Sequence, residues 1–431
     1  MSRTSAQRVA AIALVLLALV AIAPSRATAA VTPQDADVNQ DNIINVLDLV
    51  AVAKRLTPRA DVNRDGAINS LDLQAVAQRF GFLLARDKYK QPFSSDSIWN
   101  MPIGSAAKYA YSGFTLSTSY AIIDEDWWLT TTASDPNKEI LNDQGVWSGP
   151  RCSATSASGR FTRFPDALIV PDVGGGSLPN RSAAILQPDG RTIIQVNALA
   201  RCLAGGSVYG VPHATIDIYG QGIAGGHGGS GLSSIGGTIR RGELVTGGSI
   251  KHALKVNVTC AVYCSPATGP GGGPGWRWPA TTSDNHCGTY ACGYGATIPT
   301  VQMGALLALP PALTETTIDA AGTSWAPGLE TEVGKRLFHA FQDYGAYVVD
   351  DAVWGGTAYA IHVERGVEDE VGATFGISID GALQSSGGAS GAYWRDYHRI
   401  WTNLKVVSNN SSTTVGGGGV PRVPPAPPIS N

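Results

Sequence analysis

The sequence predicts a small α-helical module near its start, followed by a large, mainly β domain of jelly-roll or sandwich type. Three observations support this fold class. Charged residues make up only 15% of the 431 residues while glycine occurs 52 times, which favours strands and loops over long exposed helices. Short β-type runs separated by turn residues recur through residues 91–407. An acidic loop followed by an apolar helical run occurs twice between residues 33 and 84.

Residues 1–29 have the pattern of a secretory signal peptide. Arg3 and Arg8 form a basic start, residues 9–22 are apolar, and Ala27-Thr28-Ala29 supplies a small-residue cleavage site. A membrane anchor is the alternative, but the apolar run is shorter than the roughly 20 residues that span a bilayer. We therefore expect a secreted protein with no membrane span after cleavage. The rest of the chain is acidic overall, and nothing in it suggests a nucleic-acid partner.

The two acidic loops cover residues 37–48 and 61–72. Each has oxygen-bearing side chains at loop positions 1, 3, 5, 9 and 12, the spacing of an EF-hand loop, in which position 7 adds a backbone carbonyl. Gly66 stands at position 6 of the second loop, where the chain turns sharply. We predict two Ca²⁺ ions, one in each loop. The predicted ligands are Asp37, Asn39, Asp41, Ile43, Asn45 and Asp48, and then Asp61, Asn63, Asp65, Ala67, Asn69 and Asp72.

A helical run follows each loop, at residues 47–56 and 71–80, and no separate helix enters the loops. This duplicated arrangement resembles a dockerin domain over about residues 33–84. The resemblance implies calcium binding and a cohesin-type scaffold protein as a partner. Because dockerins usually carry glycan-degrading enzymes, it also implies a polysaccharide as the substrate of the attached domain. The alternative interpretation is a pair of solvated acidic turns without an ion.

The large domain is expected to span residues 91–407. Two apolar runs around Pro188-Asp189-Gly190 predict a hairpin within residues 183–196. Val333, Leu337, Phe341 and Tyr344 recur at helical spacing, so this helix should pack across a sheet. From residue 408 the composition changes to Ser, Asn and Thr and then to Gly and Pro, which predicts a disordered tail over 408–431.

All six cysteines lie in the large domain, which for an exported protein indicates disulfides. The most local pairing joins Cys152 to Cys202, Cys260 to Cys264 and Cys287 to Cys292. A zinc site built from the last four of these cysteines, with His286, is the alternative.

Residues 209–257 are the densest in groups that can do chemistry. His213, Thr215, Asp217 and Tyr219 alternate, so on a strand they would share one face. The glycine-rich stretch around His227 lacks the pattern of a phosphate-binding loop, and it misses the G-x-S-x-G pattern of a serine hydrolase by one position.

Glycoside hydrolysis needs two carboxyls that flank the scissile bond. The carboxyls available for this task are Asp217, Glu243, Asp284, Asp350 and Asp351. Our predicted catalytic residues are Asp217, Glu243, His213, His227 and Asp350. The predicted substrate-binding residues are Tyr219, Arg240, His252, Trp276 and Trp278, where flat aromatic rings can stack on sugars.

The sequence therefore predicts a secreted polysaccharide-degrading protein, most simply a glycoside hydrolase carried on a calcium-binding module. A polysaccharide lyase is the first alternative, because Arg240, Arg241, His252, Lys255 and Tyr219 could neutralise a uronate and supply a base. A non-catalytic carbohydrate-binding or cell-surface structural protein is the second.

Overall fold

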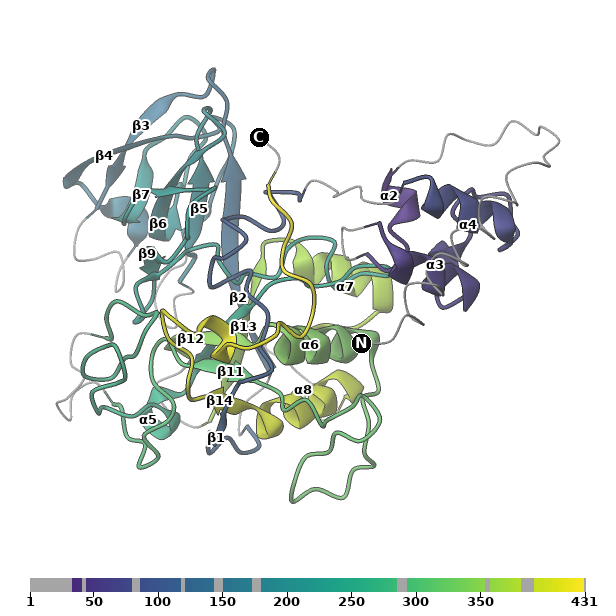
Figure 1. The fold of residues 1–431 in the computed structure, drawn as a ribbon. Helices are drawn as coiled ribbons and strands as arrows, with labels where there is room; N and C mark the ends of the chain where they lie inside the picture. The colour runs from purple at the N-terminus through teal and green to yellow at the C-terminus, as the bar shows by residue number, and fades with distance from the viewer. Residues whose placement is uncertain are drawn as a thin grey trace. The chain divides into compact units, whose positions relative to one another are not determined.

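The computed structural model divides the chain into two compact units, residues 1–84 and 85–431 (Figure 1). The structure describes residues 33–40, 44–79, 86–117, 121–142, 150–172, 180–284, 293–352, 357–380 and 391–429. The predicted signal peptide lies outside these residues. Within the described residues, no helix has the length and apolar character needed to cross a membrane.

The small unit consists of two loop-and-helix repeats. Its helices are α2 (Pro33–Ala36), α3 (Val46–Ala53) and α4 (Ser70–Ala77), with a 3₁₀ turn η2 (Pro58–Ala60) between the repeats. Both long helices begin with the same capping box, formed by Asn45 with Asp48 and by Asn69 with Asp72. The core is built from matching positions of the two repeats: Val38 and Val62, Val52 and Val76. The last loop residue is thus also the third residue of the helix, which fixes the loop to the helix that follows it.

One mixed sheet forms the backbone of the large unit. Its strands follow the order β1-β14-β11-β12-β10-β13-β2-β5-β6-β7-β3-β4, and β8 pairs with β6. Their bounds are β1 Tyr109–Tyr111, β2 Ala121–Thr130, β3 Asn137–Leu141, β4 Ala157–Arg163, β5 Ala183–Leu186, β6 Thr192–Ala200, β7 Val208–Pro212, β8 Ile216–Asp217, β10 Leu254–Val258, β11 Leu306–Ala308, β12 Ala346–Asp351, β13 Tyr359–Glu364 and β14 Lys405–Val407. A further strand, β9, covers Ala224–His227.

The mainly β character is confirmed, whereas the jelly-roll or sandwich topology is not. A jelly roll is built from antiparallel strands, but here β10 runs parallel to β12, β13 to β2, β2 to β5, and β3 to β7. The central strands are buried on both faces, so their apolar runs lack the alternation that would distinguish a parallel from an antiparallel sheet. The predicted hairpin is confirmed as the antiparallel pair β5–β6.

The two faces of the central strands differ in chemistry. On one face, Val256, Val348, Ile361 and their neighbours form the main apolar core. Helices α6 (Glu332–Asp343) and α8 (Ala392–Asn403) pack into this core, as Figure 1 shows beside β11 to β14, and α7 (Val367–Phe375) contributes Val367 and Val371. The expected helix is therefore present and serves packing. The opposite face of the same strands carries polar residues, described below.

The C-terminal segment is ordered, which corrects the expected disordered tail. The N–H of Ser105 donates to the carbonyl of Val420 at 2.8 Å, and Arg86 forms a bridge with Ile429. Gly417 has φ +87°, and a Cβ there would lie 2.6 Å from the backbone of Ala107. The glycines that suggested a flexible spacer instead allow close packing of the segment against residues 102–107.

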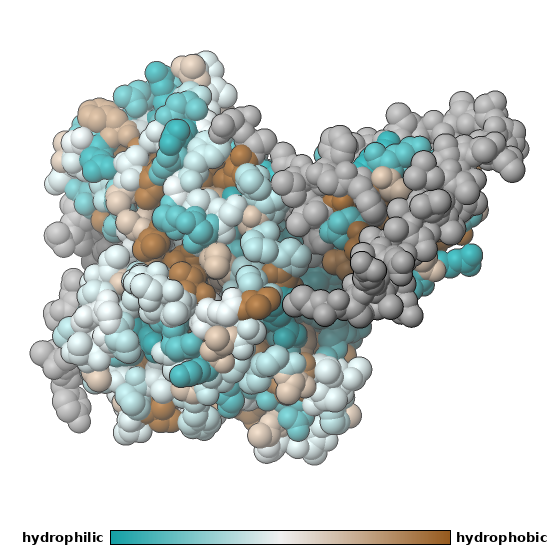
Figure 2. Space-filling view, viewed as in Figure 1, coloured by the Kyte–Doolittle hydropathy of each residue, from teal (hydrophilic) through white to brown (hydrophobic). Residues whose placement is uncertain are grey.

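Two of the predicted disulfides are present, Cys152–Cys202 and Cys260–Cys264. The third predicted pair, Cys287–Cys292, lies outside the described residues. Because Cys260 and Cys264 are bonded to each other, they are not available as thiolate ligands for the alternative zinc site. On the face of the large unit seen in Figure 2, hydrophilic and intermediate residues dominate, and hydrophobic residues form small separate groups.

Candidate functional site

A polar cluster lies on the central strands, opposite the apolar core. Asp124 and Asp126 are two residues apart on β2, so their side chains share a face, and His362 on β13 pairs in register with Asp124. On β10, Lys255 and Asn257 face the same side, because Asn257 pairs with Ala360, two residues from His362. The cluster continues onto β12, where Asp350 pairs with Asn257. Four adjacent strands thus place these side chains together.

A buried ion pair forms the base of the cluster. Lys255 Nζ lies 3.0 Å from Asp126 Oδ2, and both side chains are fully buried. Thr238 Oγ1 also donates to Asp126 Oδ2, at 2.6 Å. Burial opposes ionisation of Asp126, but the charge of Lys255 and the contact with His362, whose Nδ1 lies 3.4 Å from Asp126 Oδ2, hold its pKa below the usual value. Burial lowers the pKa of Lys255, an effect that Asp126 partly offsets. The two side chains stabilise each other's position, because removing either one would leave a buried charge without a partner and would destabilise the fold.

Two further carboxyls lie on either side of a glycine pair. The N–H of Gly229 donates to Asp350 Oδ1 at 3.0 Å, and a Cβ on Gly228 would lie 2.0 Å from the Asp350 carboxyl carbon. A Cβ on Gly229 would lie 2.7 Å from the carboxylate oxygens of Asp284. Tyr294 Oη donates to Asp284 Oδ2 at 3.1 Å. Only residues without a side chain can occupy positions 228 and 229 while both carboxyls hold these places.

The environment keeps Asp350 protonated at neutral pH. Burial raises the pKa of Asp350 to about 8, and the negative charge of Asp284 adds to the effect. Burial also raises the pKa of Asp284, against the hydrogen bond from Tyr294. Asn180 Nδ2 donates to Asp350 Oδ2 at 2.7 Å and to Asp124 Oδ2 at 3.1 Å, so it links the carboxyl pair to the rest of the cluster.

Of the predicted catalytic residues, the structure brings His227 and Asp350 into this cluster. One ligand atom each of His227, His362 and Asp124 lie within 4.8 Å of one another. Burial lowers the pKa of His227 well below its usual value, so its ring is neutral. His213 lies beside the cluster, because its ring packs against Gly226, which precedes His227. Burial lowers the pKa of His213 as well.

The other two predicted catalytic carboxyls form ion pairs outside the cluster. Asp217 Oδ2 accepts from Arg191 Nε at 2.8 Å, on the exposed side of β8. Glu243 Oε2 lies 3.1 Å from His252 Nε2, and it also accepts from the N–H of Arg240 at 2.6 Å. Although burial opposes it, Glu243 raises the pKa of His252. Both carboxyls therefore fix local structure.

The predicted substrate-binding residues are dispersed. Tyr219 Oη accepts from Lys88 at 2.9 Å, and the buried guanidinium of Arg240 stacks on Trp128. Trp276 packs against the main apolar core, while Trp278 packs against a second core that contains Trp99. His252 is held by Glu243. These residues do not line one cleft in the described part of the chain.

Several cluster residues were not among the predicted site residues: Asp124, Asp126, Asn180, Asn257 and His362. A signal was present in the sequence. Asp124 and Asp126 alternate within residues 121–130, and His362 interrupts the apolar run Tyr359-Ala360-Ile361-His362-Val363. A charged or imidazole side chain in a strand that is otherwise apolar is expected to have a buried partner. Finding which strands were neighbours required the sheet order.

The second acidic loop brings its predicted ligands together. Asp61 accepts from the N–H groups of Asp65 and Gly66, at 3.1 and 3.0 Å, and Asp72 accepts from Asn63 and Asn69, at 3.1 and 2.8 Å. Gly66 has φ +86°, as the turn requires. In the first loop, Asp48 accepts from Val38, Asn39 and Asn45; Asp41 and Ile43 lie outside the described residues. The convergence of carboxylate, amide and carbonyl oxygens fits a hard cation such as Ca²⁺.

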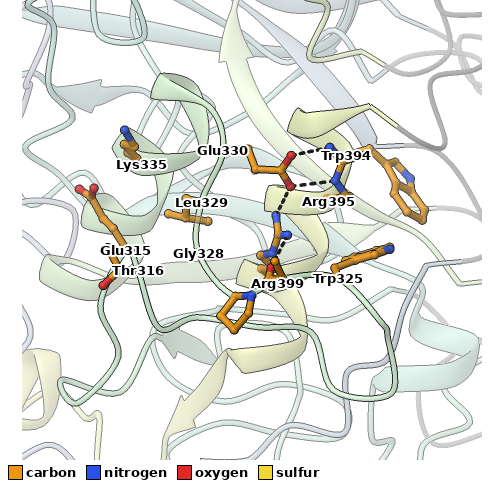
Figure 3. Close-up of a pocket in the computed structure, with 12 residues that line it drawn as sticks. Glu315, Thr316, Trp325, Gly328, Leu329, Glu330, Lys335, Trp394, Arg395 and Arg399 are labelled. Atoms are coloured by element: carbon orange, nitrogen blue, oxygen red, sulfur yellow. Dashed lines mark hydrogen bonds and ion pairs between the residues drawn. The ribbon is translucent and has the colours of Figure 1, made fainter.

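A surface cavity of about 820 Å³ lies beside α6 and α8 (Figure 3). Trp325 and Trp394 form one side, with ring centroids 5.5 Å apart, and Glu315 and Lys335 lie on the other. Glu330 accepts from Arg395 and from Arg399 Nη1, the latter at 2.6 Å, and these hydrogen bonds lower its pKa to about 2. The cavity therefore combines aromatic surface with fixed charges of both signs.

The raised pKa of Asp350 predicts a specific pH dependence of stability. Between about pH 4 and pH 8 the folded protein keeps a proton that the unfolded chain releases. The free energy of unfolding should therefore fall with rising pH, by about 1.4 kcal/mol per pH unit for one proton. Urea unfolding of the wild type and of Asp350→Asn at pH 5, 6 and 7 measures this slope. The wild type should lose stability relative to the variant, and two parallel curves would contradict the assignment.

Residues 35–81 match the Dockerin type I domain family, and this segment is a dockerin domain. Dockerin domains bind calcium and cohesins, and they often occur on carbohydrate-active enzymes of extracellular assemblies. The comparison with curated proteins and the comparison with solved structures each found no match.

Proposed function

From the premise that residues 35–81 form a dockerin domain, we propose that the chain is an exported glycoside hydrolase whose catalytic carboxyls are Asp350 and Asp284. The observation that carries this proposal is the placement of the Asp350 and Asp284 carboxyls against the adjacent glycines Gly228 and Gly229, together with the raised pKa of Asp350. A glycosidase needs one carboxylic acid and one carboxylate near the scissile bond. Two carboxyls whose environments separate their protonation states meet that requirement.

In this proposal Asp350 is the general acid and Asp284 is the carboxylate. Burial and the negative charge of Asp284 disfavour ionisation of Asp350, so the state in which the pair keeps one proton is favoured. Tyr294 stabilises the charge on Asp284 by its hydrogen bond. The N–H of Gly229 and the amide of Asn180 orient the Asp350 carboxyl, which would protonate the leaving glycosidic oxygen. This proposal does not use the sequence-based candidates Asp217 and Glu243, which form ion pairs with Arg191 and His252.

Incubation of the full chain with a panel of polysaccharides tests the reaction class. A hydrolase releases new reducing ends without ultraviolet absorbance, whereas a lyase produces unsaturated uronates that absorb. New reducing ends that are lost in Asp350→Asn would support the proposal. Absorbing products would indicate the lyase, and no product from any polysaccharide would contradict both enzyme classes.

The cavity beside α8 favours a second candidate function, carbohydrate binding. Trp325 and Trp394 are half-buried, and both line the cavity. The ion pairs of Glu330 with Arg395 and Arg399 hold polar groups beside the rings. This combination suits a sugar, which presents an apolar face and a rim of hydroxyls.

Substitution Trp394→Ala tests carbohydrate binding at this cavity. We expect affinity for a bound oligosaccharide to fall about 10-fold, because truncation of an anchoring tryptophan costs more than 1 kcal/mol. Isothermal titration calorimetry measures the change. The matched control is Tyr111→Ala, which removes an exposed aromatic ring elsewhere on the large unit. Equal oligosaccharide affinity of the two variants would contradict carbohydrate binding at this cavity.

A further inference from the structure

We propose that His227, His362 and Asp124 bind a divalent transition metal ion of the zinc class. The site is separate in composition from the two acidic loops, since it contains two imidazoles and lies in the large unit. One ligand atom from each of the three residues lies within 4.8 Å of the other two. Ligands of one zinc ion, each about 2.1 Å from it, are at most about 4 Å apart. A small inward shift of the side chains therefore completes the geometry.

The ring of His227 supplies the strongest evidence for a missing partner. The side chain is fully buried, yet neither Nδ1 nor Nε2 has a hydrogen-bond partner in the described part of the chain. Leaving a buried polar group unpaired costs about 1–3 kcal/mol. The ring of His362 stands nearly perpendicular to it, with centroids 4.4 Å apart. Coordination of an ion between the rings would satisfy a nitrogen that otherwise remains unpaired.

The tautomer of His362 is set by its neighbour Asn257. Asn257 Nδ2 donates to Asp124 Oδ2 at 3.2 Å, so the Oδ1 of the same amide is the atom that faces His362. His362 Nε2 lies 2.8 Å from that Oδ1 and must donate to it. The lone pair of Nδ1 then points away from Asn257. Nδ1 lies 3.4 Å from Asp126 Oδ2, so a proton or a cation is needed between these two atoms. A ligating histidine commonly donates its other N–H to a carbonyl in this way.

Asp124 is oriented by the same network. Its Oδ2 accepts from Asn180 and from Asn257, which leaves Oδ1 for the ion. The charges around the site allow a cation. The charge of Lys255 acts on both His227 and Asp124, and Lys255 Nζ pairs with Asp126 Oδ2 at 3.0 Å. The second oxygen of Asp126, Oδ1, is buried without a hydrogen-bond partner among the described residues, 4.0 Å from His227 Nδ1. Asp124 and Asp126 therefore supply two carboxyls beside Lys255.

The ligand set identifies the class of metal. Calcium and magnesium take oxygen ligands, whereas two imidazoles with one carboxylate suit zinc and its neighbours in the first transition row. Three protein ligands leave one position for water, the arrangement of a catalytic rather than a structural zinc site. Asp124 is half-buried, unlike the two histidines.

Direct metal analysis tests the proposal independently of any enzymatic activity. The full chain, purified without chelators and dialysed against Zn²⁺ and excess Ca²⁺, is analysed by mass spectrometry for both metals. We expect about one zinc per chain. Co²⁺ in place of zinc should give the visible absorption of a four- or five-coordinate site, which calcium loops do not produce. The comparison set is His227→Asn, Asp124→Asn and Asn257→Ala, with His252→Asn as a control that removes a buried histidine elsewhere.

His227→Asn and Asp124→Asn should each weaken zinc binding at least about 100-fold, since loss of a second-shell partner alone costs 10–100-fold. Asn257→Ala should show that smaller loss, and His252→Asn should bind as the wild type does. Near-ultraviolet circular dichroism establishes whether each variant is folded. If His227→Asn does not fold, Asp124→Asn provides the test of zinc binding, because it keeps the shape of the side chain. Absence of zinc and cobalt from the wild type would overturn the proposal, as would equal zinc in Asp124→Asn. Zinc binding that persists in an inactive Asp350→Asn would support the metal site. It would also show that the metal site and the proposed catalytic pair can be tested independently.

Discussion

Replacing Asp350 by asparagine is expected to lower kcat/KM for the cleaved polysaccharide about 10²–10⁴-fold. Asparagine keeps the shape of the side chain but cannot deliver the proton that the leaving group needs. The wild-type activity should also fall above about pH 8, where Asp350 ionises. Initial rates of reducing-end release, measured from pH 5 to pH 9 for both proteins, give the two quantities.

The matched control for this experiment is Asp217→Asn. Asp217 is also a strand carboxyl with a hydrogen-bonded partner, but its partner is the exposed Arg191. We expect this variant to keep the wild-type rate and pH profile. If Asp217→Asn were inactive and Asp350→Asn active, the site would lie on the β8 side of the sheet. A basic limb that stayed near pH 8 in Asp350→Asn would assign that limb to another group.

Removal of calcium is expected to unfold the dockerin domain while the large unit remains folded. Asp48 and Asp72 are fully buried, and the other ligands crowd acidic oxygens around two short loops. Without an ion these charges repel one another, and the small apolar core contributes little to stability. Hydrogen exchange measured by mass spectrometry should show loss of protection in residues 46–53 and 70–77 after chelation. Protection should return with Ca²⁺.

A single substitution separates calcium loss from other effects of the chelator. Asp61→Ala removes the first ligand of the second loop, and it should raise the calcium concentration needed for folding. Ser70→Ala changes an exposed residue of the same loop that is not a ligand, and it should leave the titration unchanged. Unchanged exchange in residues 46–77 after complete calcium removal would refute the calcium requirement.

The two loops and the helices that follow them could be predicted from the sequence because their determinants are local, whereas the short turns α2 and η2 that precede the loops were not predicted. Ligand spacing, the glycine at position 66 and the capping residues Asn69 and Asp72 all act within a dozen residues. The order of strands in the large unit could not be predicted, because β2 pairs with β13 and β5, which are distant in the sequence. Strands buried on both faces show no alternation, and so they give no sign of their neighbours.

The candidate site shows the same limit. His227 and Asp350 stood out because they occur beside glycines or at the end of a strand. Asp124 and His362 did not, because their proximity arises only from the parallel register of β2 and β13. Asp217 and Glu243 were predicted to be catalytic because they lie in the histidine-rich stretch. In the structure they form ion pairs with Arg191 and His252. Density of reactive residues in sequence was a weaker guide than polar residues within apolar strands.

The packing of the C-terminal segment also determines when the large unit can fold. Arg86 and residues 103–106, which are made early, share backbone hydrogen bonds with residues 416–428, which are made more than 300 positions later. Strand β1 likewise pairs with β14, which is synthesised near the end of the chain. The nascent chain therefore cannot close this domain until its synthesis is nearly finished.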